Sequence, residues 1–284
     1  MTQTLGQPLR RKYDALKAAM ERYGSVIVAF SGGVDSSLVA FVAAATLGDR
    51  ALAVTSGAPS LKRSDLALTT ELARKWGMRH RIIVTDELSR ADYRANPVDR
   101  CFHCKTSLYQ ALSDIADAEG YARILNGTNT DDLGDHRPGL AAAEAYNVAS
   151  PLLETGFSKP DIRMLAAWLG LDNADKPQAA CLSSRFPYGS HITEARLAQV
   201  EQAENVLAEL GFSQYRVRHH EEVARLELLP GEMPRALELA ETIQARIRAC
   251  GYRFVAMELT GFASGSLNQG VIPLKQVGNK HLIE

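Results

Sequence analysis

The stretch Ser31-Gly32-Gly33-Val34-Asp35-Ser36-Ser37 decides the fold of this chain of 284 residues. It follows an apolar, β-branched run at residues 26–30 and leads into a helix-forming run at residues 38–45. A tight glycine turn between a strand and a helix presents backbone N–H groups and the positive end of the helix to an anion. The stretch therefore predicts a loop that binds nucleotide phosphates, and its expected contacts are Ser31, Gly32, Gly33, Asp35, Ser36 and Ser37.

The same stretch also permits a simpler interpretation, an ordinary turn in which Asp35 caps the following helix. Two glycines, three serines and an aspartate placed so closely after a buried strand favour the phosphate loop. The loop is not of the Walker type, because G-x-x-x-x-G-K-[ST] requires a lysine that this stretch lacks. Its pattern S-G-G-x-D-S resembles the pyrophosphate-binding loop of the PP-loop ATPases, which are adenine nucleotide alpha-hydrolase-like proteins. That resemblance implies cleavage of ATP between the α- and β-phosphates, with adenylylation of a substrate oxygen.

Composition narrows the class of protein. The chain has 32 Lys and Arg residues against 33 Asp and Glu residues, a net charge of −1. This balance is not typical of nucleic-acid binders, so we expect no nucleic-acid partner. No apolar run approaches the roughly 20 residues that cross a bilayer, and the N-terminus lacks a signal sequence, so we expect a cytoplasmic protein without a membrane partner. Four cysteines in a chain of this length do not form a disulfide scaffold, and in a reducing compartment they suggest metal binding or catalysis.

The first part of the chain alternates between helix-forming and strand-forming patterns. An amphipathic helix is expected at residues 8–23, and Ser60 is expected to cap another that ends at Trp76. Helices of about 10–16 residues between the strands imply right-handed crossovers and a parallel sheet. We therefore predict an α/β fold with a doubly wound parallel sheet that binds its ligand at the carboxyl ends of the strands. The expected strands are residues 26–30, 51–56, 80–85 and 123–125.

The C-terminal part predicts a second, smaller α/β domain. Ser158 begins a helix that ends near Gly170, and a mixture of helices and strands of ferredoxin-like kind follows. The expected helices and strands are residues 194–210, 215–220, 224–228, 234–248 and 254–259. The chain is accordingly divided into an ATP-binding domain at 1–175, a cysteine-containing loop and linker at 176–192, and a substrate or oligomerisation domain at 193–284.

Polar residues are also expected at the rim of the first sheet. The segment Asn126-Gly127-Thr128-Asn129-Thr130-Asp131-Asp132 follows the fourth strand, where a nucleotide should lie. An Asx-rich turn that caps the next helix explains the segment equally well locally. Beside the phosphate loop it resembles the adenine-side loop of the PP-loop ATPases, which implies that Gly127 contacts the nucleotide. Ser56 has another usual contact position in such folds, and Arg137 either balances a phosphate or adenylate or lies in solvent.

Three cysteines belong to segments with reactive features. Cys101 and Cys104 are three positions apart where a helix is expected to begin, and the helix end with its neighbouring Arg and Lys favours thiolates. Cys181 belongs to a long loop with Pro, Gly and Ser. Such loops are usually functional or disordered, and this one is too apolar for disorder. A zinc site with His103 as fourth ligand, a redox dithiol and a [4Fe–4S] cluster with one open iron are the alternatives. The count of three cysteines fits the cluster best.

Four motifs together indicate one family. They are the phosphate loop, N-G-T-N-x-D-D, the R-C-x-x-C-K segment at Cys101 and Cys104, and A-C-L-S-S-R-x-P-Y-G at Cys181. Over nearly the whole chain they resemble the LarE family of ATP-dependent sulfur transferases, which help to make the nickel-pincer nucleotide cofactor. The resemblance implies that ATP, with Mg²⁺, adenylylates the carboxylates of a pyridinium-3,5-dicarboxylate mononucleotide and that sulfur then replaces each adenylate. It also implies a homo-oligomer.

The family uses two sources of sulfur. In one, the cysteine matching Cys181 attacks the acyl-adenylate, and cleavage of its Cβ–S bond leaves dehydroalanine, so the protein is consumed. In the other, three cysteines hold a [4Fe–4S] cluster whose open iron carries sulfide from a donor that the sequence does not identify. Because the chain has Cys101, Cys104 and Cys181, it resembles the cluster type, and these are the expected metal ligands. Cys181 and Asp35 are the expected catalytic residues.

A substrate that carries a phosphate requires a second anion site. Ser184 and Arg185 lie beside Cys181, and Arg216 and Arg218 alternate onto one face of an expected strand. Solvated arginines paired with neighbouring glutamates explain Arg216 and Arg218 equally well, and the family resemblance favours the phosphate role. Two acidic residues are expected to hold a metal, to orient an arginine or to be solvated: Glu204 and Glu227.

Two other functions remain open on the sequence. A PP-loop tRNA thiolase shares the adenylylation and cysteine chemistry, but it usually has a basic RNA-binding face and further Cys pairs that this chain lacks. A non-enzymatic module that only binds ATP is disfavoured by the reactive features of the Cys181 loop. A PP-loop amide synthetase uses ammonia and has no need of three thiols.

Overall fold

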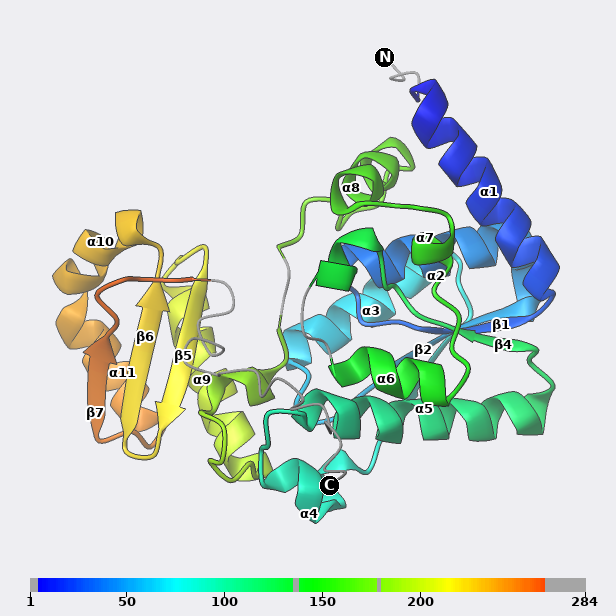
Figure 1. Cartoon of the computed structure of the whole chain (residues 1–284). Helices are drawn as coiled ribbons and strands as arrows, with labels where there is room; N and C mark the ends of the chain where they lie inside the picture. The colour runs from blue at the N-terminus through cyan, green and yellow to red at the C-terminus, as the bar shows by residue number, and fades with distance from the viewer. Residues whose placement is uncertain (1–4, 135–137, 178–179, 264–284) are drawn as a thin grey trace, which may run out of the picture. The chain divides into compact units, whose positions relative to one another are not determined.

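The computed structural model describes residues 5–134, 138–177 and 180–263. The chain forms two compact units, Met1–Glu201 and Gln202–Glu284, and Figure 1 shows the elements of each. The boundary falls inside helix α9 (Glu194–Glu209). Side chains between Leu182 and Val200 belong to a core of the first unit. The expected domain boundaries at 175/176 and 192/193 therefore differ from the boundary between the compact units and remain a prediction about function.

The first unit contains a parallel sheet with the strand order β3-β2-β1-β4. In register, Val28 of β1 lies between Ala53 of β2 and Leu125 of β4. The chain order reverses between β1 and β4, the place at which doubly wound sheets bind ligands beside the carboxyl ends of their strands. All four strands lie where the sequence predicts them: β1 (Val26–Ala29), β2 (Ala51–Ser56), β3 (His80–Ile83) and β4 (Arg123–Leu125).

Alternating side chains bury both faces of this sheet. Val26 and Val28 belong to one core and Ile27 to another, because successive side chains of a strand point to opposite faces. The first core joins the sheet to α1, α2 and α8, and the second joins it to α5 and α6 (Figure 1). The helices of this unit are α1 (Gln7–Tyr23), α2 (Val34–Leu47), α3 (Arg63–Lys75), α4 (Ala91–Arg94), α5 (Arg100–Glu119), α6 (Pro138–Ala145), α7 (Pro151–Glu154) and α8 (Lys159–Trp168).

Two of these helix starts test the predictions made from local sequence. The Ser158 side chain and Asp161 exchange hydrogen bonds with each other's backbone, a capping box that begins α8 as the sequence predicts. The expectation that Ser60 caps a helix is wrong, because α3 begins only at Arg63. The Ser60 hydroxyl is buried and donates instead to Glu87 Oε1 at 3.4 Å, so a partner from another segment replaces the helix N–H.

The second unit contains a sheet of order β5-β6-β7, in which β5 and β6 are antiparallel and β6 and β7 are parallel. Its core also includes α10, α11 and the C-terminal half of α9. The ferredoxin-like β-α-β-β-α-β pattern has one strand more than the described residues supply, so that expectation is met only in part. Leu239, with φ −95° and ψ 12°, separates two helices where the sequence predicts one. The elements are β5 (Tyr215–His220), β6 (Val223–Leu228), β7 (Phe254–Met257), α10 (Met233–Glu238) and α11 (Ala240–Ala249).

Short 3₁₀ helices complete the described secondary structure. Among all the helices that the structure describes, none is long and apolar enough to cross a membrane. Cys250 follows α11 and is partly buried against the core of the second unit. The 3₁₀ helices are η1 (Gly48–Arg50), η2 (Glu87–Ser89), η3 (Thr130–Gly134), η4 (Leu182–Arg185) and η5 (Pro230–Glu232).

Candidate active site

A cavity of about 680 Å³ lies at the carboxyl edge of the first sheet, where the phosphate loop and the segment after β4 meet. Its volume is in the range of small-molecule sites. It joins the nucleotide-binding loop to three cysteines from segments that are far apart in the sequence. The sequence-predicted residues that line it are Ser31, Gly33, Asp35, Ser36, Ser56, Cys101, Cys104, Gly127, Cys181 and Ser184.

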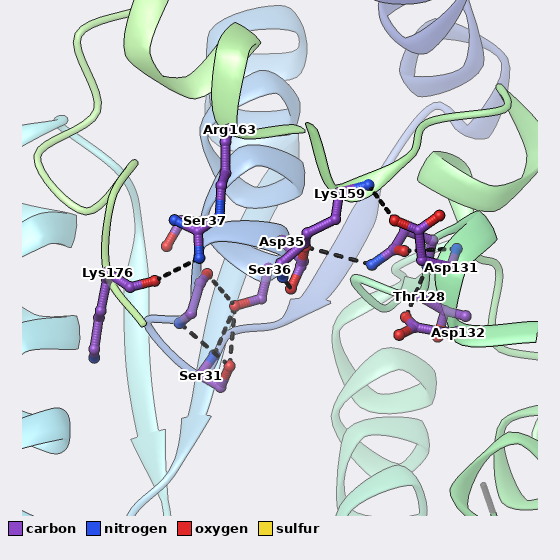
Figure 2. A network of polar contacts seen from close by, with 12 residues as sticks. Ser31, Asp35, Ser36, Ser37, Thr128, Asp131, Asp132, Lys159, Arg163 and Lys176 are labelled. Carbon is purple, nitrogen blue, oxygen red and sulfur yellow. Dashed lines mark hydrogen bonds and ion pairs between the residues drawn. The ribbon is translucent and has the colours of Figure 1, made fainter. Parts of the chain in front are cut away.

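The phosphate loop is held together by its own hydroxyl groups. Ser36 Oγ donates to the Gly33 carbonyl at 3.1 Å and accepts from the Ser31 N–H at 3.2 Å (Figure 2). Gly32 has a φ of +71°, and a Cβ there would lie 3.0 Å from Thr69 Cγ2, so backbone conformation and packing both require glycine. Gly33 is the N-cap of α2 and lines the cavity. The positive end of this helix therefore faces the cavity.

Ser37 lies beneath the loop instead of at the cavity. Its side chain is fully buried, and its hydroxyl accepts from the Asn173 side-chain amide at 2.7 Å. The same amide donates to the Gly32 carbonyl at 2.9 Å, so Asn173 holds the loop from below. Among the expected loop contacts, Gly32 and Ser37 do not line the cavity. Nothing in the local sequence of Asn173 indicates this supporting role.

Asp35 forms an ion pair that the sequence does not reveal. It lies in the first turn of α2, not at the cap, and its Oδ2 accepts from Lys159 Nζ. Asn129 donates to Asp35 Oδ1 at 3.4 Å. Lys159 is the first residue of α8, and its backbone N–H donates to Asp131 at 2.8 Å, so Figure 2 shows it between two carboxylates. The pair brings a cation to the edge of a phosphate loop that contains none.

Two further expected nucleotide contacts line the same cavity. A Cβ at Gly127 would lie 2.7 Å from the backbone nitrogen of Ser36, so only glycine permits this close approach to α2. Ser56, the last residue of β2, lines the cavity, and its hydroxyl lies 2.7 Å from that of Thr85. Arg137, the remaining expected contact, lies outside the described residues.

The three cysteines line the cavity without forming disulfides. Cys101 and Cys104 lie in the first two turns of α5, and Cys181 directly precedes η4. Loss of hydration and the charge of Cys181 raise the pKa of Cys101, although that residue as a whole is exposed. Burial, followed by the charge of Glu87, raises the pKa of Cys104 to about 12. The expectation that both thiols are shifted toward thiolate is therefore wrong, because desolvation outweighs the neighbouring cations.

Two cations accompany the thiols. Arg100 and Lys105, the neighbouring cations that the sequence places beside Cys101 and Cys104, both belong to α5 and line the cavity. Burial opposes the charge of each, but the electrostatic influence of Cys181 and Cys101 raises the pKa of Arg100. The pKa of Lys105 is raised despite burial by Tyr109 and the three thiols. Both side chains therefore favour their positively charged form in this part of the cavity.

His103 is not placed to be a fourth ligand. Its ring nitrogens lie 3.1 Å from Asp92 and 3.8 Å from Asp99, and it is absent from the lining of the cavity. A zinc site formed by the three cysteines would therefore lack His103 as its fourth ligand. In the described ranges, no three His, Cys, Asp or Glu side chains are grouped to hold a single metal ion. A [4Fe–4S] cluster binds its thiolates on separate irons, and Cys101, Cys104 and Cys181 all line this cavity.

Carboxylates suitable for Mg²⁺ lie beside the phosphate loop. Asp35, Asp131 and Asp132 all line the cavity. Magnesium in nucleotide sites is typically bound by one or two carboxylates together with phosphate oxygens. Asp132 Oδ2 accepts from the Asn129 N–H at 3.0 Å, which fixes the direction of that carboxylate.

The residues expected to bind a substrate phosphate are placed in different ways. Ser184 lines the cavity, and its hydroxyl donates to the Cys181 carbonyl at 2.8 Å. Arg185 is buried and donates to the carbonyls of Ala180 and Cys181 at 3.0 and 3.2 Å. Its guanidinium therefore supports the loop that carries Cys181.

Arg216 and Arg218 belong to the second unit. Arg218 and Glu227 form a bidentate, almost fully buried ion pair with N–O distances of 2.9 and 2.8 Å. Arg216 lies over the ring of Phe262, 4.6 Å from its centroid. Glu227 pairs with the guanidinium of Arg218 that a phosphate would need, so Glu227 orients an arginine. The expected binding of a substrate phosphate by Arg216 and Arg218 remains a prediction. Glu204 accepts from the Val217 N–H at 3.1 Å.

The chain is similar in sequence to known proteins over nearly its whole length. Residues 11–118 match the family model described as asparagine synthase. The pyridinium-3,5-bisthiocarboxylic acid mononucleotide synthase of Lactiplantibacillus plantarum is 37% identical over 92% of this chain and 95% of its own length. An uncharacterised Synechocystis protein is 40% identical over 92% of this chain and 98% of its own length. An uncharacterised protein of Methanocaldococcus jannaschii is 26% identical, over 84% of this chain and 91% of its own length.

Proposed function

This chain belongs to the LarE family of ATP-dependent sulfur transferases, and from this premise we propose that it converts both carboxylates of pyridinium-3,5-dicarboxylate mononucleotide into thiocarboxylates. The observation that supports this most strongly is the single cavity shared by the phosphate loop and Cys101, Cys104 and Cys181. The Lactiplantibacillus relative is named for synthesis of the bisthiocarboxylic acid mononucleotide. That product differs from the dicarboxylate by one sulfur in place of oxygen in each carboxyl group.

In the first step, a carboxylate oxygen of the substrate attacks the α-phosphorus of ATP, and the bond to the bridging oxygen of the β-phosphate breaks. The products are an acyl-adenylate and pyrophosphate. The carboxylate needs this activation because oxide is a very poor leaving group, whereas AMP is a good one. The N-terminus of α2 and the ammonium group of Lys159 are suited to stabilise the developing negative charge. Mg²⁺, when bound by Asp35, Asp131 or Asp132, supplies Lewis-acid stabilisation of the phosphates.

In the second step, a sulfur nucleophile attacks the acyl carbon and AMP leaves. Hydrosulfide gives the thiocarboxylate with loss of one proton, so each carboxylate consumes one ATP and one sulfide. Cys101, Cys104 and Cys181 would hold a [4Fe–4S] cluster, which supplies an open iron for sulfide. Arg100 and Lys105 balance the negative charge of the thiolates.

The alternative source of sulfur is Cys181 itself. Its thiolate would attack the acyl carbon to form a thioester, and loss of the Cα proton with cleavage of the Cβ–S bond would leave thiocarboxylate and dehydroalanine. This route uses one cysteine and gives no reason for Cys101 and Cys104 to line the same cavity. We therefore favour the route that uses all three.

Pyrophosphate and AMP release tests the proposed reaction. With ATP, Mg²⁺ and the dicarboxylate mononucleotide, the protein should release pyrophosphate, and the same mononucleotide without carboxylates should give none. Cys181→Ser should retain pyrophosphate release but form no thiocarboxylate, since the cysteine acts only in the second step. Pyrophosphate release with tRNA instead would favour a thiolase, and ATP binding without release would favour a non-enzymatic module.

Iron and acid-labile sulfide content distinguishes the two sources of sulfur. Protein purified without oxygen should contain about four iron and four sulfide per chain, and Cys101→Ala or Cys104→Ala should lose them. Cys250→Ala is the matched control, because that cysteine packs against the core of the second unit and should leave the iron content unchanged. Iron-free protein would contradict the cluster. A loss of the elements of H₂S at Cys181 after turnover would then establish the sacrificial route.

We also propose that the protein acts in the cytoplasm as a homo-oligomer with a small-molecule nucleotide as its substrate. A reducing compartment suits cysteines that form no disulfide. The donor of the sulfide is a separate component. Light scattering after gel filtration would measure the oligomeric state, and a monomer at working concentration would contradict that part of the proposal.

A further inference from the structure

The loop that carries Cys181 is fastened to the start of α5 by Asn96. Asn96 is fully buried and has a φ of +53°, a conformation that asparagine adopts more readily than most residues. Its side-chain amide donates to the Pro187 carbonyl at 2.7 Å and to that of Phe186 at 3.4 Å. Its own carbonyl accepts from the Gly189 N–H at 2.9 Å. One residue thus holds three points of the loop.

Arg100 makes a second connection between the same segments. Its guanidinium is buried, and one nitrogen, Nη1, donates both to the Asn96 side-chain oxygen and to the Ser183 carbonyl, the latter at 2.9 Å. Arg100 directly precedes Cys101, and Ser183 is two residues after Cys181. The contact therefore joins two cysteine-bearing segments across 83 positions of the chain.

Two more bonds fix the turn that follows Cys181. The hydroxyls of Tyr93 and Ser183 lie 2.6 Å apart and are buried, and the Leu182 N–H donates to the Ser60 carbonyl at 2.8 Å. The Leu182 side chain is fully buried in a core with Tyr93. Cys181 itself is exposed and lines the cavity. Its backbone is thus fixed while its side chain remains available.

We call the contacts of Asn96 and Arg100 with the Cys181 loop the clamp. Through Arg100, the clamp also brings a positive charge to the thiols. Arg100 donates to an amide and a carbonyl, and it has no carboxylate partner in the part of the chain that the structure describes. A buried cation without a carboxylate is rare, because removing a charge from water is costly. Arg100 directly precedes Cys101 and lines the same cavity as the three cysteines, so its guanidinium places a buried positive charge beside the thiols.

We propose that Asn96 and Arg100 are positioning residues for the sulfur step, which hold Cys181 beside Cys101 and Cys104 so that the three serve one sulfur species. This inference rests on the proposed function, because it assigns both residues to the second half-reaction. Their side-chain hydrogen bonds go to the cysteine loop or to each other. Adenylylation should therefore not depend on them.

The test follows pyrophosphate and thiocarboxylate separately in a single turnover, with the full-length protein in excess over the dicarboxylate mononucleotide. Asn96→Gly removes the amide contacts and tolerates the positive φ, and Arg100→Gln removes the charge. We expect pyrophosphate release within about twofold of wild type and thiocarboxylate formation about 10²-fold slower, the cost of misplacing a reacting group by about 1 Å. Arg100→Lys should recover most of the rate, because a single nitrogen makes both native bonds and an ammonium group donates more than once.

Hydrogen exchange provides a second readout that needs no substrate. The amides of Gly189 and Ile192 donate to the carbonyls of Asn96 and Arg94, and both should exchange faster in Asn96→Gly and Arg100→Gln. Amides of α2 should be unaffected. Arg81→Gln is the matched control, since this exposed arginine pairs with Glu119 at the far end of α5. It should change neither half-reaction.

Four results would each overturn one of the two hypotheses. Equal losses of pyrophosphate release and thiocarboxylate formation in the Asn96 and Arg100 variants would mean that the clamp only maintains the cavity. A wild-type rate of thiocarboxylate formation in these variants would mean that it positions nothing. Either outcome would contradict the clamp proposal. If wild-type protein releases no pyrophosphate with this substrate, the proposed function fails instead. In that case unchanged exchange at Gly189 and Ile192 would overturn the clamp independently.

Discussion

Lys159 gives the phosphate loop a cation that the loop sequence lacks, through its ion pair with Asp35. Lys159→Met keeps the apolar stem and removes the charge. We expect kcat/KM for ATP to fall by about 10²-fold, the effect of removing one preorganised electrostatic contact from an anionic transition state. Initial rates of pyrophosphate release over a range of ATP concentrations measure this effect.

Lys12→Met is the matched control for this prediction. Lys12 also reaches α8, where its Nζ lies 2.7 Å from Asp161, but it does not line the cavity. We expect its loss to lower the free energy of unfolding by about 1 kcal/mol at most and to leave kcat/KM unchanged. Wild-type activity of Lys159→Met would remove that lysine from the mechanism.

Single residues show where sequence reasoning succeeds and where it stops. Ser31, Gly33 and Ser36 are predictable, because the strand-turn-helix pattern that places them is local. Lys159 is not predictable, since it lies 124 positions from its partner. The pKa of Cys104 is also set by burial under segments from elsewhere in the chain. Counting the cations beside it in the sequence therefore gives the wrong direction.

At the scale of elements, Gly127 permits the segment after β4 to touch the first turn of α2. In Gly127→Ala the new Cβ would lie 2.7 Å from the Ser36 backbone nitrogen, so the segment must move away. We expect the free energy of unfolding to fall by about 1–3 kcal/mol, as in other overpacked sites. ATP affinity should fall as well, because both elements line the cavity. Denaturant unfolding and calorimetric titration measure the two effects.

Gly170→Ala separates backbone strain from this clash. Gly170 has a φ of +73°, but a Cβ added there would meet no atom within 4 Å. We expect a cost of about 1–2 kcal/mol from the left-handed conformation alone, with normal ATP affinity. A similar loss of ATP affinity in both variants would attribute the effect to general destabilisation.

The elements themselves are largely predictable, and their exceptions have a common cause. The strands of the first sheet follow from short apolar runs separated by helices, which admit few topologies. The late start of α3 and the break at Leu239 do not follow from local patterns. The Ser60 hydroxyl donates to Glu87 instead of capping a helix, and only the folded chain brings Glu87 close to it. Local sequence thus predicts that an element exists, whereas tertiary contacts determine the residues at which it begins and ends.

At the scale of the whole molecule, the site combines segments that local reasoning does not connect. The loops after β1 and β4 are expected at one edge of a doubly wound sheet. Cys181 follows no strand of that sheet, so the topology alone does not place it beside Cys101 and Cys104. Family resemblance suggests that the three belong together, and the Asn96 and Arg100 contacts supply the physical reason.

The second unit offers a stability prediction that is distinct from ATP binding. In Glu227→Gln the buried Arg218 loses its charged partner and Arg225 loses a contact of 3.2 Å, while the shape of the side chain is kept. We expect the free energy of unfolding to fall by about 3–5 kcal/mol, because breaking a buried pair leaves an uncompensated charge. ATP affinity should not change, since every residue that lines the cavity belongs to the first unit.

Glu258→Gln is the comparison for a more exposed pair, which shares Arg225 with Glu227 but does not involve Arg218. Glu258 pairs with Arg225 at 2.6 Å, but both side chains are partly exposed, at 26% and 36%. Solvent screens such a pair, so its loss should cost about 1 kcal/mol or less. Urea unfolding followed by circular dichroism compares the two variants with wild type. Equal losses of unfolding free energy in the two variants would show that burial of the Arg218–Glu227 pair adds nothing. A large loss confined to Glu227→Gln would identify this pair as a structural element, which leaves Arg218 no spare charge for a phosphate.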